Sequence, residues 1–217
     1  MLKLVYKLAK NLRKKRFTIF VSLLENIPRP IRILDIGGTQ AFREQMGFAG
    51  NSDVQIVLLN IDKVAISSNN IFSVVGDARS MGHFKDKEFT IAFSNSVIEH
   101  VGDFHDQKMM AEEVMRVAKC YFLQTPNRFF PIEPHFFFPF FQFLPVELKL
   151  WLATHMALGT YPRIKDEEVA LRTVTAIRLL DRRELKQIFP GGRLIDERFL
   201  GLTKSLMVYK SWEDQAS

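Results

Sequence analysis

Cysteine is almost absent from this sequence, with Cys120 the single example among 217 residues. A lone cysteine cannot form an internal disulfide, and it gives no sign of an oxidising compartment. No group of cysteine and histidine residues has the spacing of a zinc-binding motif. We therefore expect no disulfide and no metal site, and a core held together by apolar packing.

Long hydrophobic runs are also missing. The apolar run at 17–24 has eight residues, which is too few to span a bilayer. It follows Lys14, Lys15 and Arg16, as the apolar part of a signal peptide would, but 25–28 offers no small-residue cleavage site. We expect a helix here that leads into the first strand. With neither a membrane span nor a cleavage site in this run, we also expect a cytoplasmic protein.

Acidic residues are absent from the first 16 positions, which hold seven basic ones. The other 201 residues contain 23 basic and 24 acidic residues, so the net charge of +6 comes from this segment. Apolar residues recur there at helical spacing, which predicts a basic amphipathic helix within 1–26 (Leu2, Val5, Leu8, Ala9 and Leu12). Two interpretations remain open: peripheral contact with the anionic inner face of a membrane, or a solvated helix at the domain edge. No basic patch interleaved with aromatic residues follows, so we expect no nucleic-acid partner.

The remainder has ordinary globular composition, with 47% hydrophobic and 25% charged residues in the whole chain. Its length fits one domain, 27–217. A helix is expected at 107–118, and Asp181 with Glu184 forms a capping box for a later one. Short apolar runs predict strands at 31–36, 54–62, 71–78, 89–93, 120–125, 193–200 and 204–209, the last two as a hairpin turning at Gly201.

The first predicted strand ends in a turn formed by Gly37 and Gly38, before a short helical pattern at 42–46. Open α/β sheets bind ligands at this place, beyond the carboxyl ends of their strands. Asp35 puts a carboxylate inside the apolar strand. An anion there disfavours a phosphate on the turn and favours a ligand that carries positive charge, such as an amino group or a sulfonium.

Two stretches resemble one enzyme family. Residues 34–38, Leu-Asp-Ile-Gly-Gly, resemble motif I of the class I S-adenosylmethionine-dependent methyltransferases, Asp/Glu-x-Gly-x-Gly-x-Gly, although Thr39 and Ala41 replace the second and third glycines. Residues 88–101 resemble the pattern Phe-Asp-x-Val-x-x-x-x-Val-Leu-Glu-His-Val of the type 11 branch, with Thr90 in place of the common Asp. The resemblance covers 31–126 and resumes at 178–186.

The resemblance implies an α/β fold: a Rossmann-like, doubly wound seven-stranded sheet, mostly parallel with an antiparallel last strand and helices on both faces. It also implies S-adenosylmethionine as the methyl donor. Asn60 or Asp62 would hold the ribose, and Asp77 with the backbone N–H of Ala78 would bind the adenine. The turn and the exit of the fourth strand complete the implied cofactor site (Asp35, Gly37, Gly38, Thr39, Ser94, Asn95 and Ser96).

Acceptor specificity is expected in the insertion at 127–177, where such enzymes vary. Eight of the 20 phenylalanines lie within 129–143, and prolines interrupt any long helix there (Pro131, Pro134, Pro139 and Pro145). The segment is either a hydrophobic lid over the acceptor that also touches a membrane, or a layer packed on a helix at 146–158. Its polar residues are the acceptor-binding candidates (Asn127, Arg128, Glu133 and His135).

Methyl transfer to oxygen or nitrogen releases a proton, and histidine suits its capture near neutral pH. His135 is the first candidate base, while His100 lies in the family motif and suits a cofactor-side or structural role better. The acceptor itself, whether a small molecule, a glycan or a lipid-linked compound, cannot be predicted. Two alternatives stay open: a non-catalytic scaffold on the same fold, and a nicotinamide-dependent reductase, which would need a Gly-x-Gly-x-x-Gly turn that the chain lacks.

Overall fold

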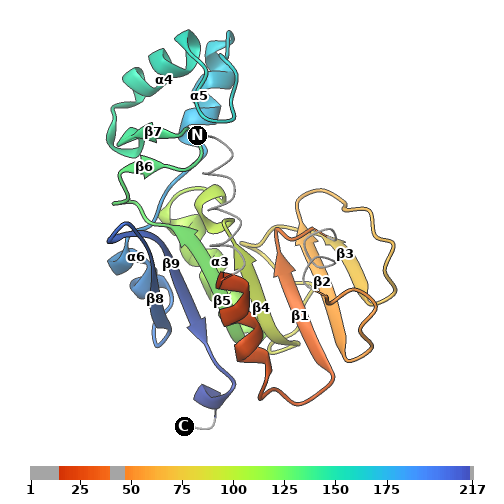
Figure 1. Ribbon diagram of the computed structural model, residues 1–217. Coiled ribbons are helices and arrows are strands. Elements are labelled where there is room, and N and C mark those ends of the chain that lie inside the picture. The colour runs from red at the N-terminus through yellow and green to blue at the C-terminus, as the bar shows by residue number, and fades with distance from the viewer. Residues whose placement is uncertain (1–14, 40–46, 216–217) are drawn as a thin grey trace.

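The computed structural model describes residues 15–39 and 47–215 (Figure 1). The predicted basic amphipathic helix and the short helix at 42–46 fall largely or wholly outside these ranges. The predicted helix at 17–24 is confirmed, because residues 15–24 are helical. In the ranges that are described, no helix is both long and apolar enough to cross a bilayer.

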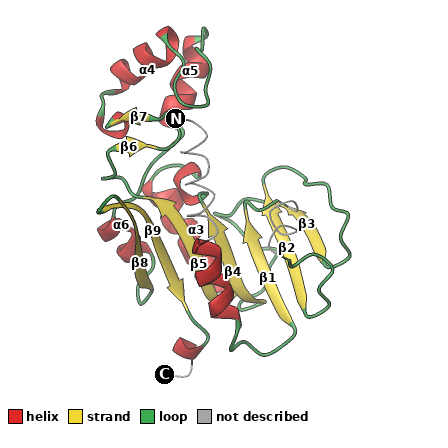
Figure 2. Ribbon diagram, viewed as in Figure 1, coloured by secondary structure: helices red, strands yellow, loops and turns green. Residues whose placement is uncertain are grey.

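A seven-stranded sheet organises the molecule, in the order β3-β2-β1-β4-β5-β9-β8 (Figure 2). The first five strands are parallel, β9 is antiparallel to β5, and β8 is antiparallel to β9. The predicted fold class is therefore confirmed. The strands are β1 Ile31–Ile36, β2 Val54–Asn60, β3 Ile71–Val75, β4 Phe89–Asn95, β5 Ala118–Pro126, β8 Arg193–Phe199 and β9 Leu202–Lys210.

Helices cover both faces of this sheet, because alternate strand residues point to opposite sides. Leu34 and Ile36 of β1 face the side covered by α3 (Phe104–Val117) and α6 (Arg182–Ile188). Ile31 and Ile33 face the other side, where Phe20 and Leu24 of the helix at 15–24 pack. Figure 1 shows this helix crossing the near face of the sheet.

The carboxyl ends of the central strands lie level with one another. Asp35 is in register with Phe93, and Asn95 is in register with Gln124. The predicted hairpin also forms, with Leu200 and Gly201 at positive φ between β8 and β9. The capping box of α6 is present, with the Asp181 carboxylate accepting from the Glu184 N–H and the Glu184 carboxylate accepting from the Asp181 N–H.

The insertion forms a layer of its own beyond the carboxyl end of β5 (Figure 1). It contains the strand pair β6 (Ile132–Glu133) and β7 (Phe138–Pro139), then α4 (Val146–His155) and α5 (Glu167–Thr175). Phe136 and Phe141 are buried against Leu152 in a small separate core, as the packed-layer interpretation predicted. Four other phenylalanines are exposed, so membrane contact remains a prediction (Phe129, Phe137, Phe140 and Phe143).

Candidate active site

Two cavities lie on either side of the turn that follows β1. One, of about 210 Å³, is lined by residues of the turn together with Phe93 and Asn95. The other, of about 320 Å³, extends from the same turn to the ends of β2 and β3, where Asn60 and Asp77 line it. Ile36 and Gly37 line both. Among the residues that the structure describes, none fills the sheet edge beside Asp35 and Asp77, which is therefore open.

The turn itself depends on its two glycines. Gly37 has φ +72°, a backbone conformation that disfavours any side chain, and a Cβ there would lie 2.4 Å from Val97. A Cβ on Gly38 would lie only 1.8 Å from the carboxylate of Asp35, which is 1% exposed. The Asn60 side-chain amide donates to the Gly38 carbonyl at 3.0 Å and ties the turn to the end of β2.

Of the two ribose candidates, Asn60 lines the larger cavity beside the turn, and Asp62 lines neither of the two. Asn60 is the last residue of β2, whereas Asp62 lies two residues beyond the strand and is exposed. Asp77 lines the same cavity, and its carboxylate forms a 2.6 Å ion pair with Arg79, which also reaches Asp106 at 2.9 Å. Hydrogen bonding from Arg79 lowers the pKa of Asp77.

The exit of β4 carries the next predicted residues. Ser94 is buried, and Ser96 adopts φ +57° while both its N–H and its hydroxyl contact Gln124. The Asn95 amide oxygen accepts from Arg16, which also donates to Gln124 and lies 3.1 Å from Glu197. Sequence reasoning did not identify Arg16 and Gln124, because nothing local connects them to a site that only tertiary packing creates.

Beyond β4, the short 3₁₀ helix η1 (Ile98–His100) carries the Glu-His pair of the second motif. Buried Gln107 of α3 donates to the carbonyls of Ile98 and Arg178, and the Arg178 N–H donates to the Glu99 carbonyl. These bonds fix η1 on the sheet. The Glu99 side chain is fully buried, and its Oε2 accepts from the Thr125 hydroxyl at 3.0 Å.

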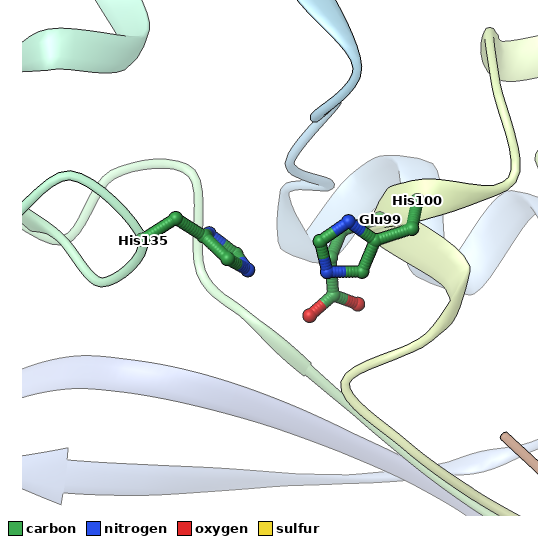
Figure 3. A group of neighbouring side chains, drawn as sticks. All are labelled: Glu99, His100 and His135. Carbon is green, nitrogen blue, oxygen red and sulfur yellow. The ribbon is translucent and has the colours of Figure 1, made fainter. Parts of the chain in front are cut away.

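His135 reaches this place from the insertion, and Figure 3 shows its ring directed toward Glu99 and His100. Buried Glu133 orients it: Oε1 lies 2.6 Å from Nδ1, and Oε2 accepts from the backbone N–H groups of His135 and Phe136. Because a carboxylate oxygen can only accept, Nδ1 donates, and in the neutral ring Nε2 carries the free lone pair. The rings of His100 and His135 meet edge to face, with centroids 4.8 Å apart.

The three groups differ in their protonation. Burial raises the pKa of Glu99 to about 7. Partial desolvation of the exposed residue His100 and the charge of His135 lower the pKa of the His100 ring. For His135, burial by itself lowers the pKa, but the hydrogen bond that its ring donates to Glu133 and the charges of Glu133 and Glu99 outweigh this effect, so the pKa is raised. Three titratable groups with shifted pKa values therefore lie close together, a pattern typical of functional sites.

The other predicted acceptor residues lie apart from this cluster. The Asn127 amide donates to the Thr203 carbonyl at 2.8 Å, which gives it a structural role beside β9. Arg128 lines a separate cavity of about 260 Å³ with Lys149 and Arg178. The sequence thus grouped Asn127, Arg128, Glu133 and His135 by proximity along the chain, and the fold brings only Glu133 and His135 together.

Comparisons with known proteins agree with this geometry. Residues 34–120 match a family model described as a methyltransferase domain. Similar solved structures include a SAM-dependent methyltransferase from Aquifex aeolicus, at 10% identity, with 89% of this chain and 87% of that chain covered and a TM-score of 0.53. No curated protein matches the sequence.

Two further similar structures belong to longer chains, of which the match covers half or less. The CurJ carbon methyltransferase is 11% identical, with 87% of this chain and 50% of that chain covered and a TM-score of 0.52. Phosphoethanolamine N-methyltransferase 2 from Haemonchus contortus was solved in complex with phosphomonomethylethanolamine and S-adenosylhomocysteine. It is 13% identical, with 84% of this chain and 38% of that chain covered and a TM-score of 0.50. Such identities establish a shared fold alone, and the family match over residues 34–120 indicates S-adenosylmethionine-dependent methyl transfer. Residues 34–120 thus form a methyltransferase domain of the class I, S-adenosylmethionine-dependent type.

Proposed function

We propose that this enzyme binds S-adenosylmethionine along the carboxyl edge of β1, β2 and β3, and transfers its methyl group to an oxygen or nitrogen atom of a small-molecule, glycan or lipid-linked acceptor. The observation that carries the proposal is the pair of cavities flanking the Gly37–Gly38 turn, with a carboxylate at each. The bare glycine backbone leaves space for close approach, and the carboxylates suit a cationic ligand.

The cofactor-binding residues divide between the two cavities. Asp35, Gly37, Gly38 and Thr39 surround the smaller one, and the sulfonium-bearing part of the ligand fits beside the Asp35 carboxylate. Asn60, Asp77 and Ala78 line the larger one, where the nucleoside fits. Arg79 now pairs with Asp77, but it also holds Asp106, so it keeps a partner when Asp77 accepts a hydrogen bond from a ligand.

The acceptor enters between the sheet edge and the insertion. S-adenosylmethionine supplies an electrophilic methyl group, and the protein contributes alignment and exclusion of water. Ser96 lines a small cavity with Pro134 of the insertion, and His100 lines the larger cofactor cavity. His100 thus joins the cluster of Glu99, His100 and His135 to the cofactor cavity, and the acceptor would present its reacting atom on this side.

Calorimetric titration with S-adenosylhomocysteine tests the cofactor half of the proposal. The unaltered protein should bind, and Asp77→Ala should bind more weakly while remaining folded. Asp86→Ala is the matched control, because Asp86 is largely exposed and lines none of these cavities. An absence of binding up to millimolar ligand would count against the proposed site.

Transfer of a labelled methyl group tests the acceptor half. Fractions of small molecules, glycans and lipids from the source cell are incubated with the enzyme and labelled S-adenosylmethionine. We expect label in one fraction, and its loss in Asp77→Ala at limiting cofactor. Label in none of the fractions would contradict the proposed acceptor classes, even if the cofactor binds.

A further inference from the structure

Side chains that bind metal ions meet at one place from two distant segments. Glu99 and His100 come from η1, and His135 comes from the insertion (Figure 3). One potential ligand atom of each lies within 4.8 Å of the other two. We propose that these three residues form a binding site for a divalent transition-metal cation of the zinc class, which takes two imidazole nitrogens and one carboxylate in catalytic sites.

The Glu99 carboxylate supplies independent evidence. It is completely buried, and only Oε2 has a hydrogen-bond partner, the Thr125 hydroxyl. Oε1 has none within the part of the chain that the structure describes. Buried carboxylate oxygens are ordinarily paired or bound to a metal, because desolvation without a partner is costly. Oε1 is therefore the natural ligand atom, with Thr125 orienting the carboxylate from the other side.

Glu133 provides the second shell of such a site. Metal-bound histidines usually donate their other ring N–H to a carboxylate or carbonyl, which fixes the ring and leaves the second nitrogen free for the metal. His135 has this arrangement, with Nδ1 2.6 Å from Glu133 Oε1. Glu133 is itself held by two backbone N–H groups and is 2% exposed. The backbone around Glu133 thus aims Nε2 of His135 before any ion arrives.

The geometry needs only a small adjustment. Tetrahedral zinc with ligands at about 2.0–2.1 Å places its ligand atoms roughly 3.3 Å apart, so a spacing of up to 4.8 Å must contract. His100 is the exposed member of the group and its side chain can rotate, whereas Glu99 and His135 are held by Thr125 and Glu133. We expect His100 to close onto the ion.

Three protein ligands leave one position open. His100 also lines the larger cofactor cavity, which shares Ile36 and Gly37 with the smaller cavity proposed for the sulfonium, so the ion would lie beside the cofactor; this placement rests on the proposed function. A cation of this class lowers the pKa of a bound hydroxyl. An acceptor hydroxyl would then lose its proton to water, its oxygen would bond to the methyl carbon, and the C–S electron pair would stay on sulfur. The inferred acceptor class is therefore hydroxyl-bearing.

Metal binding by the full chain tests this inference. Protein freed of metal by a chelator is titrated with Zn²⁺ in competition with a chromophoric chelator, and with Co²⁺ while its visible spectrum is recorded. We expect one ion per chain and a visible Co²⁺ absorption band with the intensity of a four- or five-coordinate ion. Glu99→Gln, His100→Gln and His135→Gln should each weaken Zn²⁺ binding at least tenfold, and Glu133→Gln by roughly 10- to 100-fold.

His155→Gln is the matched control, since His155 is an exposed histidine on α4 that stacks on Trp151, outside the cluster. It should bind Zn²⁺ like the unaltered protein. Unchanged affinity in all four cluster variants, or loss of binding in the control instead, would overturn the site. Circular dichroism melting confirms that each variant is folded, and the Co²⁺ band of Glu133→Gln remains informative if a ligand variant unfolds.

Titration of the metal-free protein with S-adenosylhomocysteine separates the two proposals. If the nucleoside binds and Zn²⁺ does not, the metal inference fails by itself and the proposed function stands. If Zn²⁺ binds with the expected variant pattern and the nucleoside does not, the site exists but its placement beside a cofactor is wrong.

Discussion

At the scale of single residues, the space left by Gly38 determines whether the β1 turn can form beside a buried acid. The Asp35 carboxylate lies where a side chain at position 38 would have to go. Asp35 is buried, and the Asn60 side chain holds Gly38 by a hydrogen bond to its carbonyl, so neither residue can move away without disturbing the sheet edge.

Gly38→Ala should therefore lower both stability and cofactor affinity. We expect a loss of about 1–3 kcal/mol in the free energy of unfolding, which is typical of overpacking, and at least tenfold weaker binding of S-adenosylhomocysteine. Urea unfolding and calorimetry measure the two effects. Gly82→Ala is the control, because a Cβ there would meet nothing within 4 Å; equal effects of the two substitutions would refute the steric argument.

Single residues also show how far the sequence alone could lead. Asp35, Gly37 and Gly38 were predictable because their chemistry lies in one short motif, and the structure places all three at one cavity. The nearness of His135 to Glu99 was not predictable, because 36 positions separate the two residues and the fold of the insertion determines where His135 lies. The expected absence of a metal site rested on motif spacing, which is blind to ligands that only the fold assembles.

At the scale of secondary-structure elements, α6 depends on its amino-terminal cap. The Asp181 carboxylate accepts from the N–H groups of Arg183 and Glu184, and Glu184 also pairs with Arg178 at 2.5 Å. This short helix closes one face of the sheet through Leu185 and Ile188. The cap thus connects local chain geometry to the main core.

Asp181→Ala should destabilise the protein by about 1 kcal/mol, the usual value of an N-cap. The midpoint of urea unfolding should fall with an unchanged slope, since the surface exposed on unfolding stays the same. Lys186→Ala, an exposed change in the same helix, should have little effect. A larger loss in the lysine variant would show that the cap is unimportant.

The insertion has a core separate from that of the sheet, with Phe141 1% exposed at its centre. Phe141→Ala should loosen this layer by about 3–5 kcal/mol locally while the sheet remains folded. Limited proteolysis should then cut within 128–177 and leave the binding of S-adenosylhomocysteine intact. Phe129→Ala, at a side chain 63% exposed, should leave the cleavage pattern unchanged; cleavage across the sheet instead would mean that the two cores are not separable.

Elements were more predictable than their ends. The parallel strands were readable because strands buried on both faces form continuous apolar runs, as in Ile31–Ile36 and Val54–Asn60. The helix predicted at 146–158 ends at His155 because Met156 is extended, a boundary set by packing in the insertion. The strands β6 and β7 have two residues each, and no periodicity can reveal elements so short.

At the scale of the whole molecule, Arg79 and Arg116 link α3 to the segment between β3 and β4, through the ion pairs Arg79–Asp106 and Arg116–Asp86. Hydrogen bonding from Arg116 lowers the pKa of Glu113, and Arg79 does the same for Asp77. Each carboxyl has a lower pKa folded than unfolded, so the unfolded chain binds more protons in acid. This stabilisation is present above the ordinary carboxyl pKa and is lost as the pH falls through the folded-state values.

The contribution of these two carboxyl groups to stability should therefore be constant near neutral pH and fall below about pH 4.5, where carboxyl groups begin to take up protons. Urea midpoints at pH 7, 5 and 3 measure this. Glu113→Gln should be less stable at pH 7 but should lose less between pH 5 and 3. Glu112→Gln, an exposed neighbour on α3, should follow the unaltered protein; a similar acid loss in all three proteins would exclude Glu113 as a contributor.

The two ends of the insertion leave the sheet side by side. Asn127 bridges to Leu180, and the Arg128 N–H donates to the Leu180 carbonyl at 3.0 Å. A segment whose first and last residues lie next to each other can be replaced by another segment without changing how the surrounding strands and helices are connected. Descendants of such a chain could acquire new acceptors by replacing this one module, while the donor-binding half is inherited unaltered.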